Sequence, residues 1–227
     1  MAGTSPGSNK WPTLSWQKLL HDAIYLLDGL RPPPSWSFGG GTALAVFYDH
    51  RISYDVDLFV KSADTLRDLS PGRNAATKAL LDGRQFQFPG NYLKLEMAEG
   101  EIDFIVGSHH TCNPTQPWVF EGREIAIETP WETAIRKIFY RSSTFKVRDV
   151  FDLAAVIEND GENLKSNLNE VEDRLDRLID RLDALSATYE KSVVNDVNPT
   201  DKGRPYASAK AIQSTLSFLS EWRNQRS

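Results

Sequence analysis

The sequence predicts an α/β (α+β) fold: a sheet-containing core, about residues 11–128, followed by a helical region over 129–227. Three observations predict it. A glycine-rich turn, a helix-prone run and a strand follow one another over 38–60. A block with apolar alternation covers 85–106. From Thr129 onward, apolar residues recur at helical spacing. With 40% hydrophobic residues among 227, the chain has the composition of a globular protein.

The N-terminal segment precedes a first helix. Residues 1–10 are rich in Gly, Ser and Pro, so we expect a flexible N-terminus. Thr13 or Ser15 is expected to cap a helix that runs to about Leu27, because its apolar residues have helical spacing. Three prolines at 32–34 end that helix before a short strand over 35–38.

The glycines at 39–41 predict a phosphate-binding turn. Without Cβ atoms, Gly40 and Gly41 allow a tight turn close to a ligand. The residues from Thr42 onward are apolar and helix-prone, so the turn is expected at a helix N-terminus. The free N–H groups and dipole of such a terminus favour phosphate.

Two carboxylates follow on a strand. Asp55 and Asp57 are two residues apart, so in a strand both side chains project from the same face. Two such carboxylates repel unless a cation lies between them, and hard oxygen ligands suit Mg²⁺ with substrate phosphates. The plainer interpretation is a turn before a core helix and two solvated aspartates. The apolar residues 58–60 argue against it, because they predict a central strand.

The rest of the core is expected to alternate helix and strand. Helices are expected over 63–81, interrupted at 71–72, strands over 85–88, 92–98, 101–106 and 123–128, and a loop over 107–118. Asp103 lies within one of these strands, where an edge aspartate is the alternative to a functional one. His109, His110 and Cys112 lack the further ligands of a tetrahedral zinc site.

Four features organise the helical region. Thr129 and Glu132 have the spacing of a capping box with Pro130 between them. A long amphipathic helix is expected over 164–185, packed on its neighbours or, alternatively, forming a coiled-coil seam. A polar loop over 191–205 and a last helix over 207–223 follow.

Composition narrows the classes of function. A net charge of −5 and a pI near 5.4 give no overall basic surface, so an RNA substrate would need a local basic patch. One cysteine excludes an intramolecular disulfide. No apolar run predicts a membrane span or signal peptide, so no membrane partner and a cytoplasmic location are expected.

The pattern Gly-Gly, thirteen residues, Asp-Val-Asp resembles the signature of the DNA polymerase β-like nucleotidyltransferases. The fuller string over 40–44 and 50–59 resembles the AbiEii/AbiGii family, the toxins of type IV toxin–antitoxin systems. A second block, Lys-Val-Arg-Asp-Val-Phe-Asp-Leu at 146–153, also resembles that family. The resemblance covers about 36–60, 92–106 and 131–153, and weakens after Leu153.

The resemblance implies a site. It implies one or two Mg²⁺ ions held by Asp55, Asp57 and Asp103, with Asp103 also the candidate general base. The residues expected to bind a nucleoside triphosphate are Gly40, Gly41, Thr42, Arg51, Ser53, Lys137, Arg141, Lys146 and Arg148, with Lys137 also expected to act in catalysis. For each basic residue a solvated helix face is the alternative, and Asp149 and Asp152 are either functional or structural partners of Arg141 or Arg148.

The expected reaction is transfer of a nucleoside monophosphate to an acceptor hydroxyl. The resemblance implies tRNA or another RNA as one acceptor and an antitoxin protein as partner, and it leaves protein acceptors open. Two alternatives stand beside it: a small-molecule (aminoglycoside-type) nucleotidyltransferase, and a non-catalytic module that senses nucleotides or binds a partner. The presence of all three carboxylates favours an enzyme.

Overall fold

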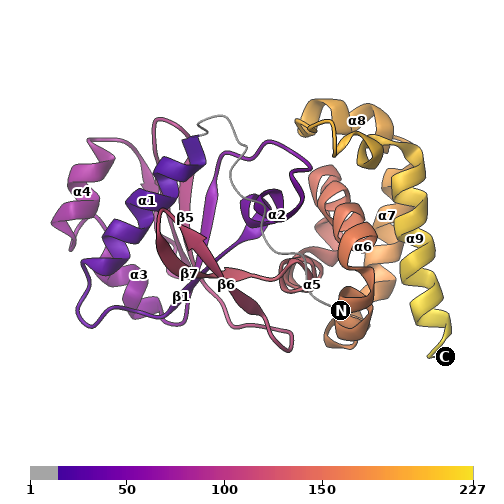
Figure 1. Cartoon of the computed structure of the whole chain (residues 1–227), viewed down its shortest axis with the longest axis horizontal. Coiled ribbons are helices and arrows are strands. Elements are labelled where there is room, and N and C mark those ends of the chain that lie inside the picture. Colours follow the sequence, from indigo (N-terminus) through magenta and orange to yellow (C-terminus); the bar gives the residue numbers. More distant parts are fainter. Residues whose placement is uncertain (1–14, 227) are drawn as a thin grey trace.

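The computed structural model describes residues 15–226 and shows a sheet-containing half beside a helical half (Figure 1). The expected flexible segment 1–10 and Thr13 lie outside the described residues. The strands are β1 (Trp36–Gly39), β2 (Val56–Val60), β3 (Phe86–Gln87), β4 (Tyr92–Glu96), β5 (Glu101–Val106), β6 (Thr115–Phe120) and β7 (Arg123–Glu128). The α-helices are α1 (Ser15–Asp28), α2 (Gly40–Tyr48), α3 (Ala63–Leu69), α4 (Ala75–Leu81), α5 (Pro130–Arg141), α6 (Val147–Asn167), α7 (Leu175–Ser186), α8 (Tyr189–Asp196) and α9 (Ala209–Asn224).

The strands form one mixed sheet in the order β3-β4-β5-β2-β1-β7-β6. The central strand β2 runs antiparallel to β1 and parallel to β5. Its residues Leu58 and Val60 are fully buried, as the apolar run predicts. The register places Asp57 opposite Gly39 on one side and Asp103 on the other. The glycine turn and two of the predicted carboxylates therefore meet at one end of the sheet.

Some helices pack on the sheet, and the others form the helical half beside it (Figure 1). Helices α1 and α3 pack on β5, while α2 contacts both the sheet and the helices α5 and α6. Among the described residues no helix has the length and apolar content needed to cross a membrane. The expected boundary falls where the sheet ends at Glu128 and α5 begins at Pro130; the division into two domains stays a prediction.

The structure corrects two expectations for the helical region. The long helix expected over 164–185 is broken: a 3-10 segment, Leu168–Arg174, separates α6 from α7, and Val171 has φ −132°. The break lets the 3-10 segment pack on α5 while α7 packs on α9, which one straight helix does not do. Residues 191–196 of the loop expected over 191–205 belong to α8 instead. This helix is favoured because Tyr189, Val193 and Val197 are buried at a spacing of four.

Two smaller expectations are confirmed only in part. The loop expected over 107–118 ends early, because β6 begins at Thr115; Pro117 is tolerated there since β6 is an edge strand. Thr129 is the N-cap of α5, but its side chain makes no capping hydrogen bond. Glu132 instead accepts hydrogen bonds from the backbone N–H groups of His110 and Thr111.

Candidate active site

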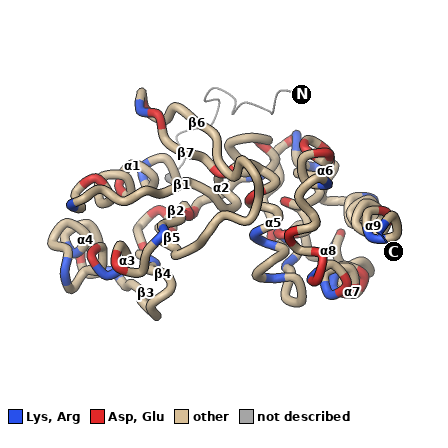
Figure 2. The backbone as a smooth tube through the Cα atoms, turned by 90° about the horizontal axis from the view of Figure 1, so that it is seen from below, with Lys and Arg blue, Asp and Glu red and all other residues tan. Residues whose placement is uncertain are grey.

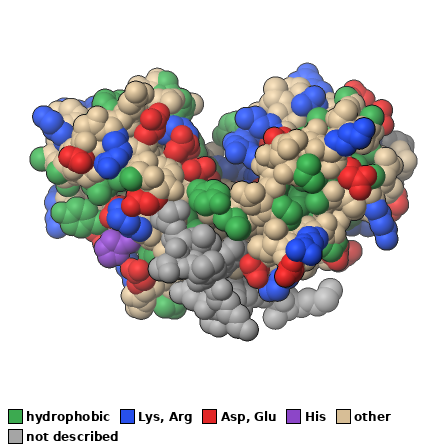
Figure 3. Space-filling model, turned by 90° about the horizontal axis from the view of Figure 1, so that it is seen from above, with side chains coloured by type: hydrophobic (Ala, Val, Ile, Leu, Met, Phe, Trp, Pro, Cys, Tyr) green, Lys and Arg blue, Asp and Glu red, His purple; other side chains and the backbone are tan. Residues whose placement is uncertain are grey.

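A cavity of about 740 Å³ lies between the sheet and the helices. Its wall includes the α2 N-terminus, the three predicted carboxylates, one face of α5 and the C-terminal end of α8. Figure 2 shows acidic positions beside β2 and basic positions on α5, on the facing parts of the two halves. In Figure 3 the surface is hollowed between these halves, with side chains of both charges at its edges. The sequence-predicted residues that line the cavity are Gly40, Gly41, Thr42, Arg51, Ser53, Asp55, Asp57, Asp103, Lys137, Arg141 and Arg148.

The glycine turn lies directly against two of these side chains. Gly40 has φ +71°, in the left-handed region, and a Cβ there would lie 1.9 Å from Oδ2 of Asp57. A Cβ on Gly41 would lie 2.0 Å from Nη2 of Arg51. Glycine is required at Gly40 by its positive φ and the contact with Asp57, whereas a side chain at Gly41 would displace the end of the Arg51 side chain. The N-terminus of α2 is therefore in contact with a carboxylate and a guanidinium.

Asp57 and Asp103 are neighbours across the β2–β5 pair. Burial raises the pKa of Asp57, against the opposing effect of the cations Arg141 and Lys137. Burial and the Asp57 charge raise the pKa of Asp103 to about 7. Oδ1 of Asp103 is buried and makes no hydrogen bond within the described part of the chain. Oδ1 of Asp103 is therefore available to coordinate a cation.

Asp55 lies at the entrance of β2 and lines the same cavity. Its Oδ1 accepts a hydrogen bond from the backbone N–H of Glu101, 3.1 Å away. Within residues 15–226, no three His, Cys, Asp or Glu side chains are grouped closely enough to hold a metal ion as they stand. The donors still fit Mg²⁺, because all are hard carboxylate oxygens and Asp103 presents an unpartnered one.

Two hydroxyls and Arg51 form a chain that ends at Asp55. The hydroxyl of Thr42 donates to the main-chain carbonyl of Asp55 and lies 2.7 Å from Oγ of Ser53. Because a hydroxyl carries a single hydrogen, Ser53 must be the donor in that second contact. Arg51 Nη1 in turn donates to Ser53 Oγ at 3.1 Å. The guanidinium, the two hydroxyls and the start of β2 are therefore held together.

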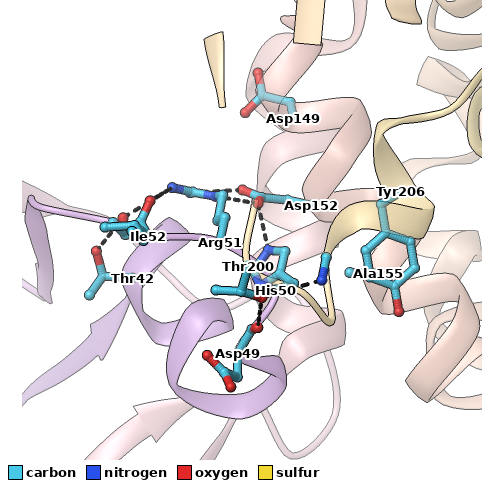
Figure 4. Close-up of polar contacts among 12 residues, drawn as sticks. Thr42, Asp49, His50, Arg51, Ile52, Asp149, Asp152, Ala155, Thr200 and Tyr206 are labelled. Atoms are coloured by element: carbon cyan, nitrogen blue, oxygen red, sulfur yellow. Dashed lines mark hydrogen bonds and ion pairs between the residues drawn. The ribbon is translucent and has the colours of Figure 1, made fainter. Parts of the chain in front are cut away.

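Asp152 of α6 contacts several basic residues, and Figure 4 shows its contacts with Arg51 and His50. It accepts two hydrogen bonds from Arg51, at 2.7 and 3.1 Å, and one from Lys137 at 2.5 Å. His50 Nε2 lies 2.8 Å from its Oδ1. Although burial alone would raise the pKa of Asp152, Arg51 and Lys137 hold it well below its usual value. Burial lowers the pKa of His50, so the neutral ring donates to Asp152.

Asp149 completes the cluster on α6. It accepts hydrogen bonds from Lys137 at 3.1 Å and Arg141 at 3.2 Å. Arg51, Lys137 and Arg141 thus pair with the two carboxylates Asp149 and Asp152, and the Asp57 carboxylate lies close to the same cations beside the α2 N-terminus. The sequence left Asp149 and Asp152 as functional groups or as structural partners of Arg141 or Arg148. The structure contains the ion pair between Asp149 and Arg141.

Arg148 and Lys146 are exposed, as Arg141 is, and they differ from each other in their place relative to the cavity. Arg148 lines the cavity, whereas Lys146 is not among its lining residues. The backbone N–H of Lys146 donates to Asp149 and so begins α6. Lys146 is therefore the N-cap residue of α6. Because Lys146 does not line the cavity, its predicted contact with phosphate has no support from the cavity.

The sequence reasoning missed several wall residues. Lys94 lies opposite Asp103 in the β4–β5 register, with Nζ 3.2 Å from Oδ2 of Asp103. A charged residue among the alternating apolar positions of that strand was the available signal. Arg136 is buried between Glu128 and Glu132, at 2.8 and 3.0 Å. The spacing of four between 132 and 136 pointed to this pair. No local signal marks the wall residues 196–198.

Comparison with known proteins identifies the family. The model of the nucleotidyl transferase AbiEii toxin of type IV toxin–antitoxin systems matches residues 30–201. No curated protein matches the chain. The nucleotidyltransferase toxin MenT4 from Mycobacterium tuberculosis aligns with a TM-score of 0.51 at 12% identity, over 92% of this chain and 86% of that one. ANT(2")-Ia, in complex with adenylyl-2"-tobramycin, aligns with a TM-score of 0.50 at 15% identity, over 70% and 98%.

At these identities the structural likeness shows the fold, a polymerase β-like nucleotidyltransferase fold with a mixed sheet. The family match covers most of the chain, including the glycine turn, the three carboxylates and the α5–α6 cluster. The chain belongs to the AbiEii family of nucleotidyltransferase toxins of type IV toxin–antitoxin systems.

Proposed function

We propose that this nucleotidyltransferase uses Mg²⁺ to transfer a nucleoside monophosphate from a nucleoside triphosphate to an acceptor hydroxyl. The observation that carries the proposal is the shared cavity: the carboxylates Asp57 and Asp103 and the α2 N-terminus lie on one wall, and the cations of α5 on another. A triphosphate needs both kinds of wall, because its charge must be neutralised while the acceptor is held beside it.

The triphosphate is placed by the chain's own groups. The backbone N–H groups of Gly40 and Gly41 at the start of α2 would meet the β- and γ-phosphates. The cations Arg51, Lys137 and Arg141 would offset the phosphate charge. Thr42 and Ser53 hold the turn, and their hydroxyls already bond to one another. Their expected phosphate contact would require that bond to open.

The acceptor hydroxyl is activated beside the carboxylate pair. Asp103 is the candidate general base, because its carboxylate lines the cavity beside Asp57 and has a buried oxygen without a hydrogen-bond partner among the described residues. Asp55, Asp57 and Asp103 would hold one or two Mg²⁺ ions. When bound, Mg²⁺ supplies charge stabilisation for the triphosphate and lowers the repulsion between the carboxylates.

The acceptor class decides the biological role. The family is named for the toxins of toxin–antitoxin systems, and this supports an antitoxin partner. As acceptor we propose RNA, with tRNA first, which the resemblance implies. The described surface of the cavity adds the exposed cations Arg141 and Arg148 at its edge, which suit a phosphate backbone. The small-molecule alternative takes its support from the fold shared with ANT(2")-Ia.

The test is transfer of label from each α-labelled nucleoside triphosphate in the presence of Mg²⁺. Total tRNA, total protein, an aminoglycoside and the enzyme itself are offered as acceptors, with Asp55→Ala/Asp57→Ala as the inactive control. Label on RNA, lost in the control, supports the proposal. Label on the aminoglycoside alone establishes the small-molecule alternative. Absence of label on every acceptor, with Mg²⁺-dependent nucleotide binding intact, favours the non-catalytic alternative.

A further inference from the structure

A segment near the C-terminus is fastened onto the loop that carries Arg51 (Figure 4). This segment, residues 198–203, is called the strap below. It forms an antiparallel bridge between Pro199 and Arg51. The backbone N–H of Ile52 donates to Asn198 at 2.9 Å, and that of Thr200 donates to His50 at 3.1 Å. The strap therefore pairs with the loop 49–52 as a short strand would.

Two strap side-chain positions tighten the pairing. The hydroxyl of Thr200 donates to the carbonyl of Asp49, the residue with φ +53° that ends α2. A Cβ on Gly203 would lie 1.6 Å from the carbonyl oxygen of His50. No side chain fits between the strap and the loop at that point. Lys202 adds an ion pair with Asp49 at 3.3 Å, but it is exposed and contributes little.

The far side of the strap is anchored in the helical half. Tyr206 donates its backbone N–H to Gly203 at 2.9 Å, and its carbonyl accepts from Tyr189 of α8 at 2.8 Å. The ring of Tyr206 packs edge-on against Phe151 of α6, which stacks on His50 with centroids 5.6 Å apart. The loop 49–52 is thus held between the strap and α6.

Arg51 is the side chain that this arrangement serves. Its guanidinium reaches Asp152 on α6 and Ser53 ahead of β2, and it lies against Gly41. All three contacts depend on where the backbone of residue 51 stands, and the strap makes the main-chain hydrogen bonds on both sides of it. A strap that only joined the two halves would not need to flank this residue.

We propose that Thr200 and Gly203 are positioning residues that hold the Arg51 guanidinium at the N-terminus of α2. The consequence for triphosphate binding rests on the function proposed above. Release of the strap would let the loop 49–52 move and would weaken the two hydrogen bonds from Arg51 to Asp152. In the intact protein Thr200 and Arg51, which are about 150 positions apart in the sequence, therefore act together.

The first test needs no nucleotide. In the ¹⁵N-labelled full chain, the Arg51 side-chain Nε–H is buried against Asp152, so it gives a slowly exchanging NMR signal, assigned by its loss in Arg51→Met. Thr200→Val, which keeps the shape and removes the hydroxyl, should speed its exchange at least about fivefold, because that hydroxyl donates to Asp49 and also accepts from the backbone N–H of Gly203 at 3.3 Å. Thr200→Ser keeps the hydroxyl and should stay within about twofold.

The glycine gives a matched pair. Gly203→Ala should speed the exchange further, whereas Gly161→Ala, whose Cβ would stand an ordinary 3.6 Å from Phe218, should leave it unchanged. If Gly203→Ala does not fold, the Thr200 pair still decides. An Arg51 signal that Thr200→Val leaves unchanged overturns the proposal, as does equal exchange in Thr200→Val and Thr200→Ser.

The second test measures label transfer. Thr200→Val should raise KM for the triphosphate about fivefold with a smaller effect on kcat, and should have no further effect in the Arg51→Met background. Effects that multiply in the double variant overturn the proposal. If the wild type neither binds nor transfers any nucleotide, the proposed function fails, while the Arg51 signal still decides the positioning role.

Discussion

Replacement of Asp103 by asparagine should stabilise the metal-free protein while it abolishes transfer. Asparagine keeps the size of the neutral acid and removes the charge. The folded protein raises the pKa of Asp103 from 3.8 to about 7, mainly by burial and by the Asp57 charge. A group whose pKa is raised on folding favours the folded state below its unfolded value and loses that contribution as the pH rises through the folded value. The ionised form therefore opposes folding above about pH 7.

The size of the effect follows from the shift. A rise of about three pKa units corresponds to about 4 kcal/mol of unfolding free energy at pH 8, and to about 2 kcal/mol at pH 5 where the carboxyl is protonated in the folded protein. Asp103→Asn should gain these amounts over the wild type. Asp183→Asn, an exposed aspartate on α7, should change stability by less than about 0.5 kcal/mol at both pH values.

Urea unfolding in EDTA at pH 5 and pH 8 measures the gain. Addition of Mg²⁺ should then raise the unfolding free energy of the wild type more than that of Asp103→Asn, because the variant has lost one proposed ligand. An asparagine variant that is less stable than the wild type at pH 8 would refute the reasoning. A gain of the same size at both pH values would refute it too.

Three further substitutions test the cavity walls. Gly40→Ala, which places a Cβ 1.9 Å from Asp57 at φ +71°, should lose about 1–3 kcal/mol of stability in urea unfolding and nearly all transfer, whereas Gly72→Ala, with nothing within 4 Å, should lose neither. Lys137→Met should lower kcat/KM about 100-fold, whereas Lys146→Met should lower it less than about threefold. Equal losses in the two variants would indicate that Lys146 also acts in the site. Arg136→Met should cost about 3–5 kcal/mol in urea unfolding, because two buried glutamates lose their cation; a loss below about 1 kcal/mol would contradict that role.

Much of the site could be predicted because its chemistry lies in one continuous stretch. The turn at Gly40 and the strand carrying Asp57 follow within twenty residues, so spacing and periodicity were enough. Asp103 stood out by its place in an apolar strand, and its candidate role came from the family resemblance. Its contact with Asp57, however, depends on strand register, which the structure supplies.

The remaining features arise from contacts between distant residues, which local patterns do not report. The pairing of Thr200 with the loop after α2 joins segments 150 residues apart, and the sequence there is merely polar. Likewise, the apolar spacing around Val171 continues smoothly through the break between α6 and α7. The break follows from packing against two different helices, and helical periodicity contains no information about that.

The most direct test of the central claim is a crystal structure of the wild-type chain with Mg²⁺ and a non-hydrolysable nucleoside triphosphate. We expect β- and γ-phosphates against the backbone of Gly40 and Gly41, metal density beside Asp57 and Asp103, and Lys137 turned toward phosphate. A triphosphate bound with its phosphates away from the α2 N-terminus, or with no metal at the two carboxylates, would contradict the account.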